Sequence, residues 1–218
     1  MKNGCCIVET RPLKNLVDII ESHHLKYLPP CWGLTIYCSS DNYSALNGVD
    51  FGRETNIHLV DTPVTTTQHY SDLLKSLTFW DSLTYDKVLI FQPDSKLLKT
   101  GIDEFLKYDY IGAPFKRGNY ASGYASNGGL SLRNVEIMKY ICRKYDLRHR
   151  RRGDGNRQED IAFCRQMNKH KIGKLAPREA CKTFSVESVF ELGTLGVHNI
   201  ERWLPAKRCK RILNQYNV

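Results

Sequence analysis

The sequence predicts an α/β fold with a largely parallel sheet, and three observations support this prediction. Short β-rich runs alternate with helix-like stretches through the first half of the chain. The run Lys87–Gln92 has a continuous apolar centre, which is typical of a strand buried on both faces. No Pro-, Gly- or Ser-rich stretch divides the 218 residues, so we expect a single domain.

The elements of the first half follow from this alternation. In chain order they are strand, helix, strand, strand, helix and strand, over Cys5–Glu9, Pro12–His23, Leu34–Cys38, Ile57–Val60, Gln68–Leu83 and Lys87–Gln92. The last of these strands stops at Pro93-Asp94-Ser95. In an open parallel sheet, ligands bind beyond the carboxyl ends of the strands. This turn is therefore expected to lie at the ligand-binding or catalytic site.

The second half is richer in glycine and aromatic residues. Its segments are Tyr108–Phe115, Tyr120–Leu132 and the helix-like Val135–Tyr145. A highly polar stretch, Arg148–Gln158, is predicted to be a mobile loop. It leads through Glu159 and Asp160 into a helix-like segment, Ile161–Lys169.

Charge and cysteine content narrow the classes of partner and compartment. The formal net charge is +9, much of it in Arg148–Arg152 and Lys207–Arg211, which indicates either anionic partners or solvated basic surfaces. The eight cysteines include no CxxC pair, and no signal-length apolar segment opens the chain. We therefore expect reduced thiols in a cytoplasmic compartment, and no membrane-spanning segment, because no stretch of about 20 apolar residues exists.

Two candidate metal ligands stand far apart in the chain. Asp94 follows a hydrophobic strand, from where a carboxylate can reach a metal that bridges two phosphates, and hard oxygen ligands suit Mg²⁺ or Mn²⁺. A turn or N-cap aspartate is the structural alternative. His198, in Gly196-Val197-His198-Asn199, offers an imidazole ligand, although a lone histidine is more often simply accommodated.

Two further groups are candidates for ligand contact and proton transfer. In Ser126–Leu132, Gly128 and Gly129 would let the backbone approach a ligand, and Asn127 offers a donor and an acceptor; a tight turn before a strand explains the glycines equally well. Glu159 and Asp160 stand at a predicted helix start, where they favour the positive helix end and where one of them could take a proton from a hydroxyl.

The order of these groups resembles the metal-dependent GT-A glycosyltransferases: an acidic DxD-like turn after a strand, then Asn-Gly-Gly, Glu-Asp and a late histidine. The chain resembles in particular the small glycosyltransferase-like domains of large DNA viruses, of the chlorovirus capsid-glycosylation type, and of some bacteria. The similarity is carried by Phe91–Ser95, Tyr108–Pro114, Ser126–Arg133 and Gly196–His198. It departs from the wider class in having one acid in the turn, with Gln92 in the earlier place.

The resemblance implies a single-domain, Rossmann-like GT-A α/β/α sandwich with a mostly parallel central sheet, made of a nucleotide-binding half over about 1–95 and an acceptor half over about 96–218. Its implied activity is hexosyl or deoxyhexosyl transfer from a nucleotide-diphosphate sugar, with UDP-sugar preferred, to a hydroxyl of a glycan or glycoprotein. It implies Mn²⁺ or Mg²⁺ on Asp94 and His198, with Gln92 or water completing the shell. The implied donor contacts are Thr10, Arg11, Gln92, Ser95, Asn127, Gly128 and Gly129.

The resemblance also implies that Asp160 is the catalytic base, with Glu159 as second choice, and it favours inversion. A nucleotidyltransferase is one alternative, but the Cys6–Leu13 turn lacks the glycine that its nucleotide loop needs. A second alternative is a non-catalytic nucleic-acid-binding domain that uses the two basic clusters, whose binding would fall with salt and ignore divalent metal. On the enzyme interpretation no nucleic acid partner is expected, and a viral source would place the protein in the host cytoplasm.

Overall fold

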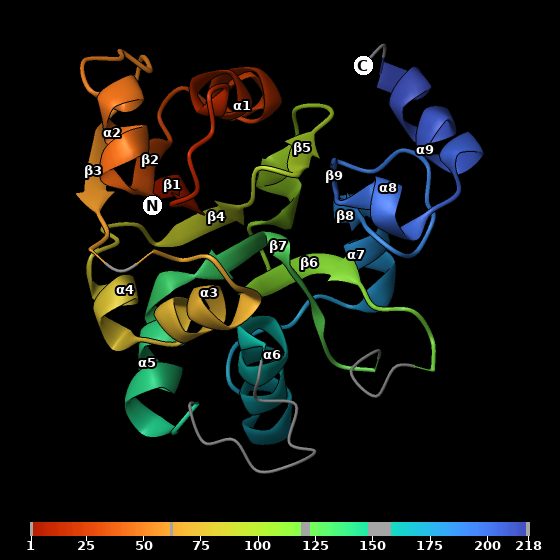
Figure 1. Cartoon of the computed structure of the whole chain (residues 1–218). Coiled ribbons are helices and arrows are strands. Elements are labelled where there is room, and N and C mark those ends of the chain that lie inside the picture. The colour runs from red at the N-terminus through yellow and green to blue at the C-terminus, as the bar shows by residue number, and fades with distance from the viewer. Residues whose placement is uncertain (1, 62, 119–122, 148–157, 217–218) are drawn as a thin grey trace.

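The centre of the fold is a six-stranded sheet in the order β3-β2-β1-β4-β7-β6 (Figure 1). The computed structural model describes residues 2–61, 63–118, 123–147 and 158–216. The strands are β1 (Asn3–Glu9), β2 (Gly33–Cys38), β3 (Thr55–Leu59), β4 (Lys87–Phe91), β6 (Tyr110–Pro114) and β7 (Ser126–Asn134). The first four are mutually parallel, and β7 is antiparallel to both β4 and β6. The predicted mixed α/β fold with a mostly parallel sheet is confirmed.

Helices cover both faces of this sheet. Figure 1 shows α1 (Leu16–His23) and α2 (Ser40–Leu46) on one face. The opposite face carries α3 (Thr67–Leu74), α4 (Leu77–Asp81), α5 (Val135–Lys144) and α6 (Glu159–His170). Alternation along β1 serves both layers, because Cys5 and Ile7 join one apolar core while Cys6 and Val8 join the other. The result is a three-layer α/β/α arrangement.

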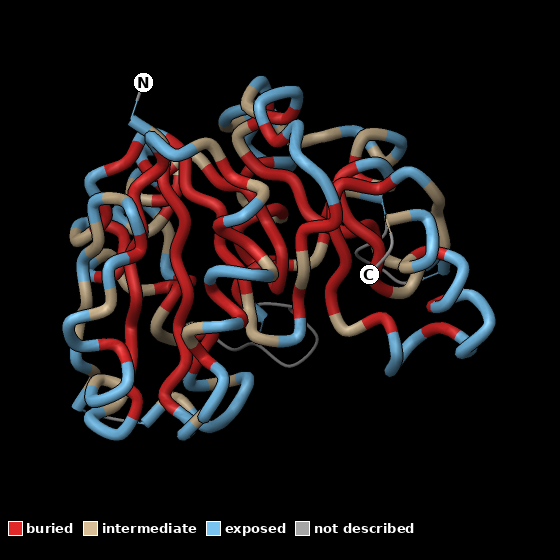
Figure 2. Tube along the Cα trace, turned by 90° about the horizontal axis from the view of Figure 1, so that it is seen from above, coloured by how far each residue is buried: buried red, intermediate tan, exposed pale blue. Residues whose placement is uncertain are grey.

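The middle of the sheet is fully covered, as the red strands of Figure 2 show. All five residues of β4 are buried, which explains its continuous apolar run. Lys87 at the start of β4 is tolerated because its Nζ donates to Asp109 Oδ1 and to Tyr108 O, each at 2.7 Å. A buried ammonium group needs such partners to offset its lost hydration.

A second, three-stranded sheet joins the C-terminal part of the chain to the turn after β4. Its order is β5-β9-β8, formed by β5 (Ser95–Leu97), β9 (Gly196–His198) and β8 (Ser185–Val186). The remaining elements are α7 (Arg178–Phe184), α8 (Ile200–Trp203), α9 (Ala206–Leu213) and the 3₁₀ turns Leu25–Tyr27, Ile102–Phe105 and Asn214–Tyr216. Nothing in the local sequence pattern predicts this sheet, because its strands are only two or three residues long.

Several predicted elements differ from the observed ones at their boundaries. The predicted helix Gln68–Leu83 is two helices, α3 and α4, because Ser76 caps the second one by accepting from Phe79 N at 3.3 Å. The helix predicted over Pro12–His23 begins at Leu16, and within the Gly-rich and aromatic segment Tyr120–Leu132 a strand, β7, begins at Ser126. The predicted loop Arg148–Gln158, and with it the basic cluster at Arg148–Arg152, lies outside the described residues except for Gln158.

The cysteines are as expected for reduced thiols. All eight are free, and six of them are buried: Cys5, Cys6, Cys38, Cys164, Cys181 and Cys209. Buried free cysteine behaves as a small apolar side chain. Among the described residues, none of the helices has both the length and the apolar character needed to cross a bilayer.

Candidate active site

A cavity of about 670 Å³ opens at one edge of the central sheet. The parallel strands β1 and β4 end there, and β7 begins there because it runs antiparallel to β4, with Phe91 opposite Leu130. All predicted site residues except Thr10 and Ser95 line this cavity; they are Arg11, Gln92, Asp94, Asn127, Gly128, Gly129, Glu159, Asp160 and His198. Segments far apart in the sequence therefore meet at the edge where ligands of open α/β sheets bind.

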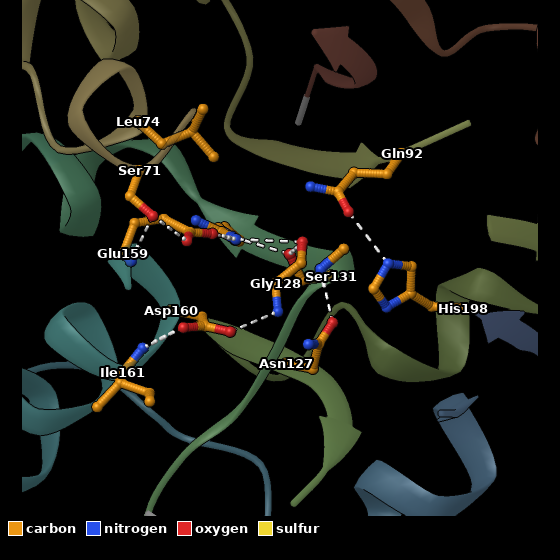
Figure 3. Close-up of polar contacts among 12 residues, drawn as sticks. Ser71, Leu74, Gln92, Asn127, Gly128, Ser131, Glu159, Asp160, Ile161 and His198 are labelled. Atoms are coloured by element: carbon orange, nitrogen blue, oxygen red, sulfur yellow. Dashed lines mark hydrogen bonds and ion pairs between the residues drawn. The ribbon is translucent and has the colours of Figure 1, made fainter. Parts of the chain in front are cut away.

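The small sheet brings His198 to the turn after β4. Pairing of β5 with β9 sets Ser95 opposite His198, and Asn199 N donates to Asp94 O at 2.9 Å. His198 Nε2 then lies 3.0 Å from Gln92 Oε1 and 3.4 Å from Asp94 Oδ1 (Figure 3 draws the contact with Gln92). One imidazole nitrogen, one carboxylate and one amide oxygen thus face one another.

Glu187 contacts the imidazole nitrogen of His198 that faces away from Asp94. No motif in the sequence pointed to this residue. It follows β8, which runs parallel to β9 with Val186 opposite Val197. Its Oε1 lies 3.3 Å from His198 Nδ1 and accepts from Asn127 Nδ2 at 3.1 Å. Burial disfavours the imidazolium form, but Asp94 and Glu187 outweigh burial and raise the pKa of His198 to about 9. The pKa of Asp94 is lowered although burial acts to raise it, because His198 stabilises the carboxylate.

The donor set suits a hard divalent cation that is shared with a ligand. No group of three or more His, Cys, Asp or Glu residues is arranged as a metal site among the described residues. Asp94, His198 and Gln92 do offer three nitrogen and oxygen donors on one side of the cavity. Mg²⁺ sites typically combine one or two protein carboxylates with phosphate and water oxygens. The second carboxylate, Glu187, faces the other imidazole nitrogen, as a residue that orients a metal-ligating histidine does.

The paired glycines allow the side chains of the site to close against β7. A Cβ on Gly129 would fall on the His198 ring, and a Cβ on Gly128 would clash with Glu159 Oε1. Asn127 Oδ1 accepts from Gly129 N at 2.7 Å, so both ends of this amide side chain bind within the protein. The glycines are therefore required by packing inside the site.

Glu159 is held by a buried arginine. Arg133 is fully buried, with its guanidinium carbon 5.9 Å from the Trp80 ring centroid and 4.9 Å from that of Tyr110. Its Nη2 donates to Glu159 Oε1 at 2.8 Å, and Ser71 Oγ lies 3.5 Å from Glu159 Oε2. A guanidinium in such an apolar cage needs a counter-charge, and Glu159 supplies it. The sequence shows Arg133 only as the end of the segment Ser126–Arg133.

Asp160 has different partners from its neighbour (Figure 3). Its Oδ2 accepts from Gly128 N at 3.0 Å and its Oδ1 accepts from Ile161 N at 2.7 Å. Burial, reinforced by the neighbouring charge of Glu159, raises the pKa of Asp160 to about 8. A carboxyl group with a pKa near the working pH can exchange a proton with a bound hydroxyl.

Glu9 and Arg11, at and just after the end of β1, form another part of the cavity wall. Glu9 holds Arg11 through two contacts, Nη2 to Oε2 at 2.5 Å and Nε to Oε1 at 3.0 Å. The Arg11 side chain remains 61% exposed, so it stays accessible to an anion. Thr10 Oγ1 accepts from Val64 N at 2.8 Å, and Ser95 Oγ donates to Gln92 O at 2.6 Å. Thr10 and Ser95 are both buried, and these bonds hold backbone around the cavity.

Solved structures of other proteins show which fold this is. The chain is similar to the apo-form glycosyltransferase GlyE of Streptococcus pneumoniae TIGR4, with a TM-score of 0.60 and 11% identity over 100% of this chain and 60% of that one. It is also similar to apo mouse xyloside xylosyltransferase 1, with a TM-score of 0.58 and 12% identity over 94% of this chain and 100% of that one. The chain thus has the fold of GT-A glycosyltransferases while spanning only 60% of the length of GlyE.

The sequence also matches the model of a protein family. The model described as "Protein of unknown function (DUF5672)" matches residues 54–198, more than half of the chain, so the protein belongs to this family. The match ends at His198 and includes β4, Asp94, the paired glycines and the acidic start of α6. No curated protein matches the sequence.

Proposed function

We propose that this protein is a glycosyltransferase that moves a sugar from a nucleotide-diphosphate sugar, a UDP-sugar in the first instance, to a hydroxyl of a glycan or glycoprotein. One observation carries the proposal. The candidate metal ligands Asp94 and His198 and the candidate base Asp160 line a single cavity at the carboxyl edge of a GT-A sheet. This is the layout that transfer from a metal-bound diphosphate needs.

The donor diphosphate would lie between the end of β1 and the turn after β4. Arg11 lines this part of the cavity and is oriented by Glu9, which leaves its exposed guanidinium edge for phosphate oxygens. Mn²⁺ or Mg²⁺ would be held by Asp94 and His198 with Gln92, and when bound it supplies neutralisation of the leaving diphosphate. Asn127, Gly128 and Gly129 would contact the donor through their backbone, because both ends of the Asn127 side chain are bonded within the protein.

Asp160 is the group that would take the acceptor's proton. In the proposed step the acceptor oxygen forms a bond to the anomeric carbon, the bond from that carbon to the diphosphate oxygen breaks, and the hydroxyl proton passes to a carboxylate oxygen of Asp160. The electron pair of the broken bond leaves on the nucleotide diphosphate. A single displacement of this kind inverts the anomeric centre. Glu159 is the weaker candidate, because its carboxylate is engaged by Arg133.

Three finer assignments belong to the same proposal. We take the transferred group to be a hexosyl or deoxyhexosyl unit and the compartment to be cytoplasmic, where eight free thiols remain reduced. The particular resemblance to the viral and bacterial glycosyltransferase-like domains remains a prediction of the motifs. The basic residues of α9, Lys207, Arg208, Lys210 and Arg211, are exposed, and we assign them no nucleic acid ligand.

A panel of nucleotide sugars tests this function. The protein is mixed with UDP-, GDP-, CMP- and dTDP-sugars, each with Mn²⁺ and with chelator, and thermal stabilisation and slow donor hydrolysis are measured. We expect one nucleotide class to raise the unfolding temperature only when metal is present, because binding to the folded state alone stabilises it. Binding of nucleic acid that falls steeply with salt and ignores metal, with no response to any donor, would instead support the nucleic-acid-binding alternative.

A further inference from the structure

Trp203 differs from the other tryptophans of the chain. Trp32 and Trp80 are buried, with 2% and 0% of their surface exposed, whereas Trp203 is 44% exposed. Trp203 also lines the cavity that holds the candidate active site. Exposing a large aromatic ring to water in a cavity wall is unfavourable, and such exposure commonly marks a ligand-binding surface.

The ring is held in place by the elements around it. It ends α8, which follows directly after His198 and Asn199, and α8 contacts α9. Ile200 and Leu204 on either side of it are buried in a separate apolar core, and Leu204 N donates to Ile200 O at 2.8 Å. The guanidinium of Arg202 lies over the indole, 5.1 Å from the ring centroid. Trp203 is therefore an anchored platform joined to the strand that carries His198.

The groups near this platform in the sequence and the sheet suit a neutral ligand rich in hydroxyls. Glu187 and Ser188, which follow β8, and Asn199, which follows His198 at the end of β9, line the same cavity and offer carboxylate, hydroxyl and amide groups. A pyranose ring has one face of C–H groups, which packs on an aromatic face, and a rim of hydroxyls, which need hydrogen-bond partners. An aromatic ring among such polar groups matches both halves of that chemistry.

The position of α8 separates this platform from the proposed donor contacts. Arg11 and Glu9 belong to the end of β1, whereas α8 lies beyond the small sheet, on the other side of β4 (Figure 1). We infer that Trp203, supported by Arg202, is the stacking platform of the acceptor subsite and takes a pyranose ring of a glycan. This inference rests on the proposed glycosyl transfer, and it assigns the acceptor a sugar ring next to the reacting hydroxyl.

Tryptophan signals test the platform without any activity measurement. Trp203 is the single exposed tryptophan of the three, so acrylamide quenching and its indole N–H resonance, assigned by its loss in Trp203→Phe, report on it alone. The probes are the methyl pyranosides of glucose, galactose, mannose, xylose and rhamnose, up to high millimolar concentration. We expect at least one to shift the Trp203 resonance and reduce quenching. In titration calorimetry, which does not depend on the Trp203 signal, Trp203→Ala should weaken binding of that pyranoside roughly tenfold, and Trp203→Phe less.

The control is Tyr140→Ala, which removes a comparably exposed aromatic ring, 42% exposed, on α5 outside the cavity wall. It should leave pyranoside binding unchanged. The inference is overturned if no pyranoside perturbs Trp203, or if UDP alone shields Trp203 as well as any sugar does, which would make it a nucleotide contact.

Binding of UDP with Mn²⁺, measured on the parent protein in parallel, separates the two proposals. If UDP binds and no pyranoside reaches Trp203, the platform is wrong while glycosyl transfer stands. If a pyranoside shields Trp203 and no nucleotide binds, the sugar platform stands while the proposed transfer is wrong.

Discussion

At the scale of single residues, two adjacent acids have separate environments. Residues next to each other on a helix point about 100° apart, so Glu159 and Asp160 at the start of α6 face different groups. In the structure Glu159 pairs with Arg133, and Asp160 accepts from Gly128 N. This division leaves Asp160 as the acid best suited to accept a proton, because the Glu159 carboxylate is engaged by Arg133.

Replacement of Asp160 by Asn should remove the base while keeping the shape of the side chain. Loss of general-base catalysis typically lowers the rate by about 10² to 10⁴. We expect a loss of turnover in this range with donor affinity almost unchanged. The measurement is sugar transfer to the acceptor, with donor binding determined in parallel. Full activity of Asp160→Asn would remove this residue from the chemical step and favour a retaining reaction.

Replacement of Glu159 by Gln should act mainly on stability. It leaves the buried Arg133 guanidinium without its counter-charge, and breaking a buried ion pair on one side costs on the order of 3 kcal/mol. Urea unfolding at neutral pH measures this loss in the free energy of unfolding. The double variant Arg133→Met with Glu159→Gln removes the uncompensated charge and should recover part of it. Equal stability of Glu159→Gln and the parent would show that the Arg133–Glu159 ion pair contributes nothing to the free energy of unfolding.

Replacement of either candidate metal ligand should impair donor binding and leave the fold unchanged. Asp94→Asn and His198→Ala should each weaken Mn²⁺-dependent donor binding while the far-ultraviolet circular dichroism stays that of the parent. The side chain of Asp94 is half exposed at the cavity, so its replacement leaves the core intact. Titration calorimetry with UDP, with and without Mn²⁺, gives the comparison. Two variants with parental metal-dependent affinity would assign both residues purely structural roles.

At the scale of elements, the short sheet β5-β9-β8 builds the site. Its register places His198 beside the turn after β4 and Glu187 behind His198, and each of these strands is only two or three residues long. The first turn of α6 contributes the acids, where the helix dipole favours carboxylates. The strand β7 passes between His198 and the acids of α6. It has no room for side chains there, so Gly128 and Gly129 occupy these positions.

Gly129→Ala tests this packing. The added methyl group would occupy the position of the His198 imidazole, so the ring must move away from Asp94 and Gln92. We expect the same loss of metal-dependent donor binding as for His198→Ala. Gly123→Ala is the matched control, because a Cβ there meets nothing within 4 Å. Normal metal-dependent binding by Gly129→Ala would mean that the position of the His198 ring is unimportant for the donor.

At the scale of the whole molecule, the cavity concentrates acids within a basic protein. The chain carries a net charge of +9, yet Glu9, Asp94, Glu159, Asp160 and Glu187 all line one cavity. Cations compensate part of this charge, chiefly Arg133 of β7 for Glu159 of α6, and Arg11 for Glu9 two residues before it. The Asp160 carboxyl instead accepts hydrogen bonds from two backbone amides.

The raised pKa of Asp160 predicts a pH dependence of both rate and stability. The base form is populated above a pKa of about 8, so turnover should rise with pH through that value, and Asp160→Asn should lose this limb. In the unfolded chain the same carboxyl ionises near 4, so between these values the folded state holds the extra proton. The contribution to stability is therefore present below about pH 4 and is lost as the pH rises towards 8. Denaturant unfolding across this range, which should be flatter for Asp160→Asn, gives the check.

Local patterns were sufficient to predict the central strands, the acidic start of α6 and the position of Asp94 after β4, because burial periodicity and strand ends depend on neighbouring residues. Most of the site residues that motif order predicted also line the cavity. The partners of those residues were decided by the tertiary structure: Gln92 meets His198 across 106 positions, Asn127 meets Glu187 across 60, and Arg133 meets Glu159 across 26. The exposed ring of Trp203 belongs with them. Such contacts depend on the register of two sheets and the path of the connections between them, which no window of local sequence specifies.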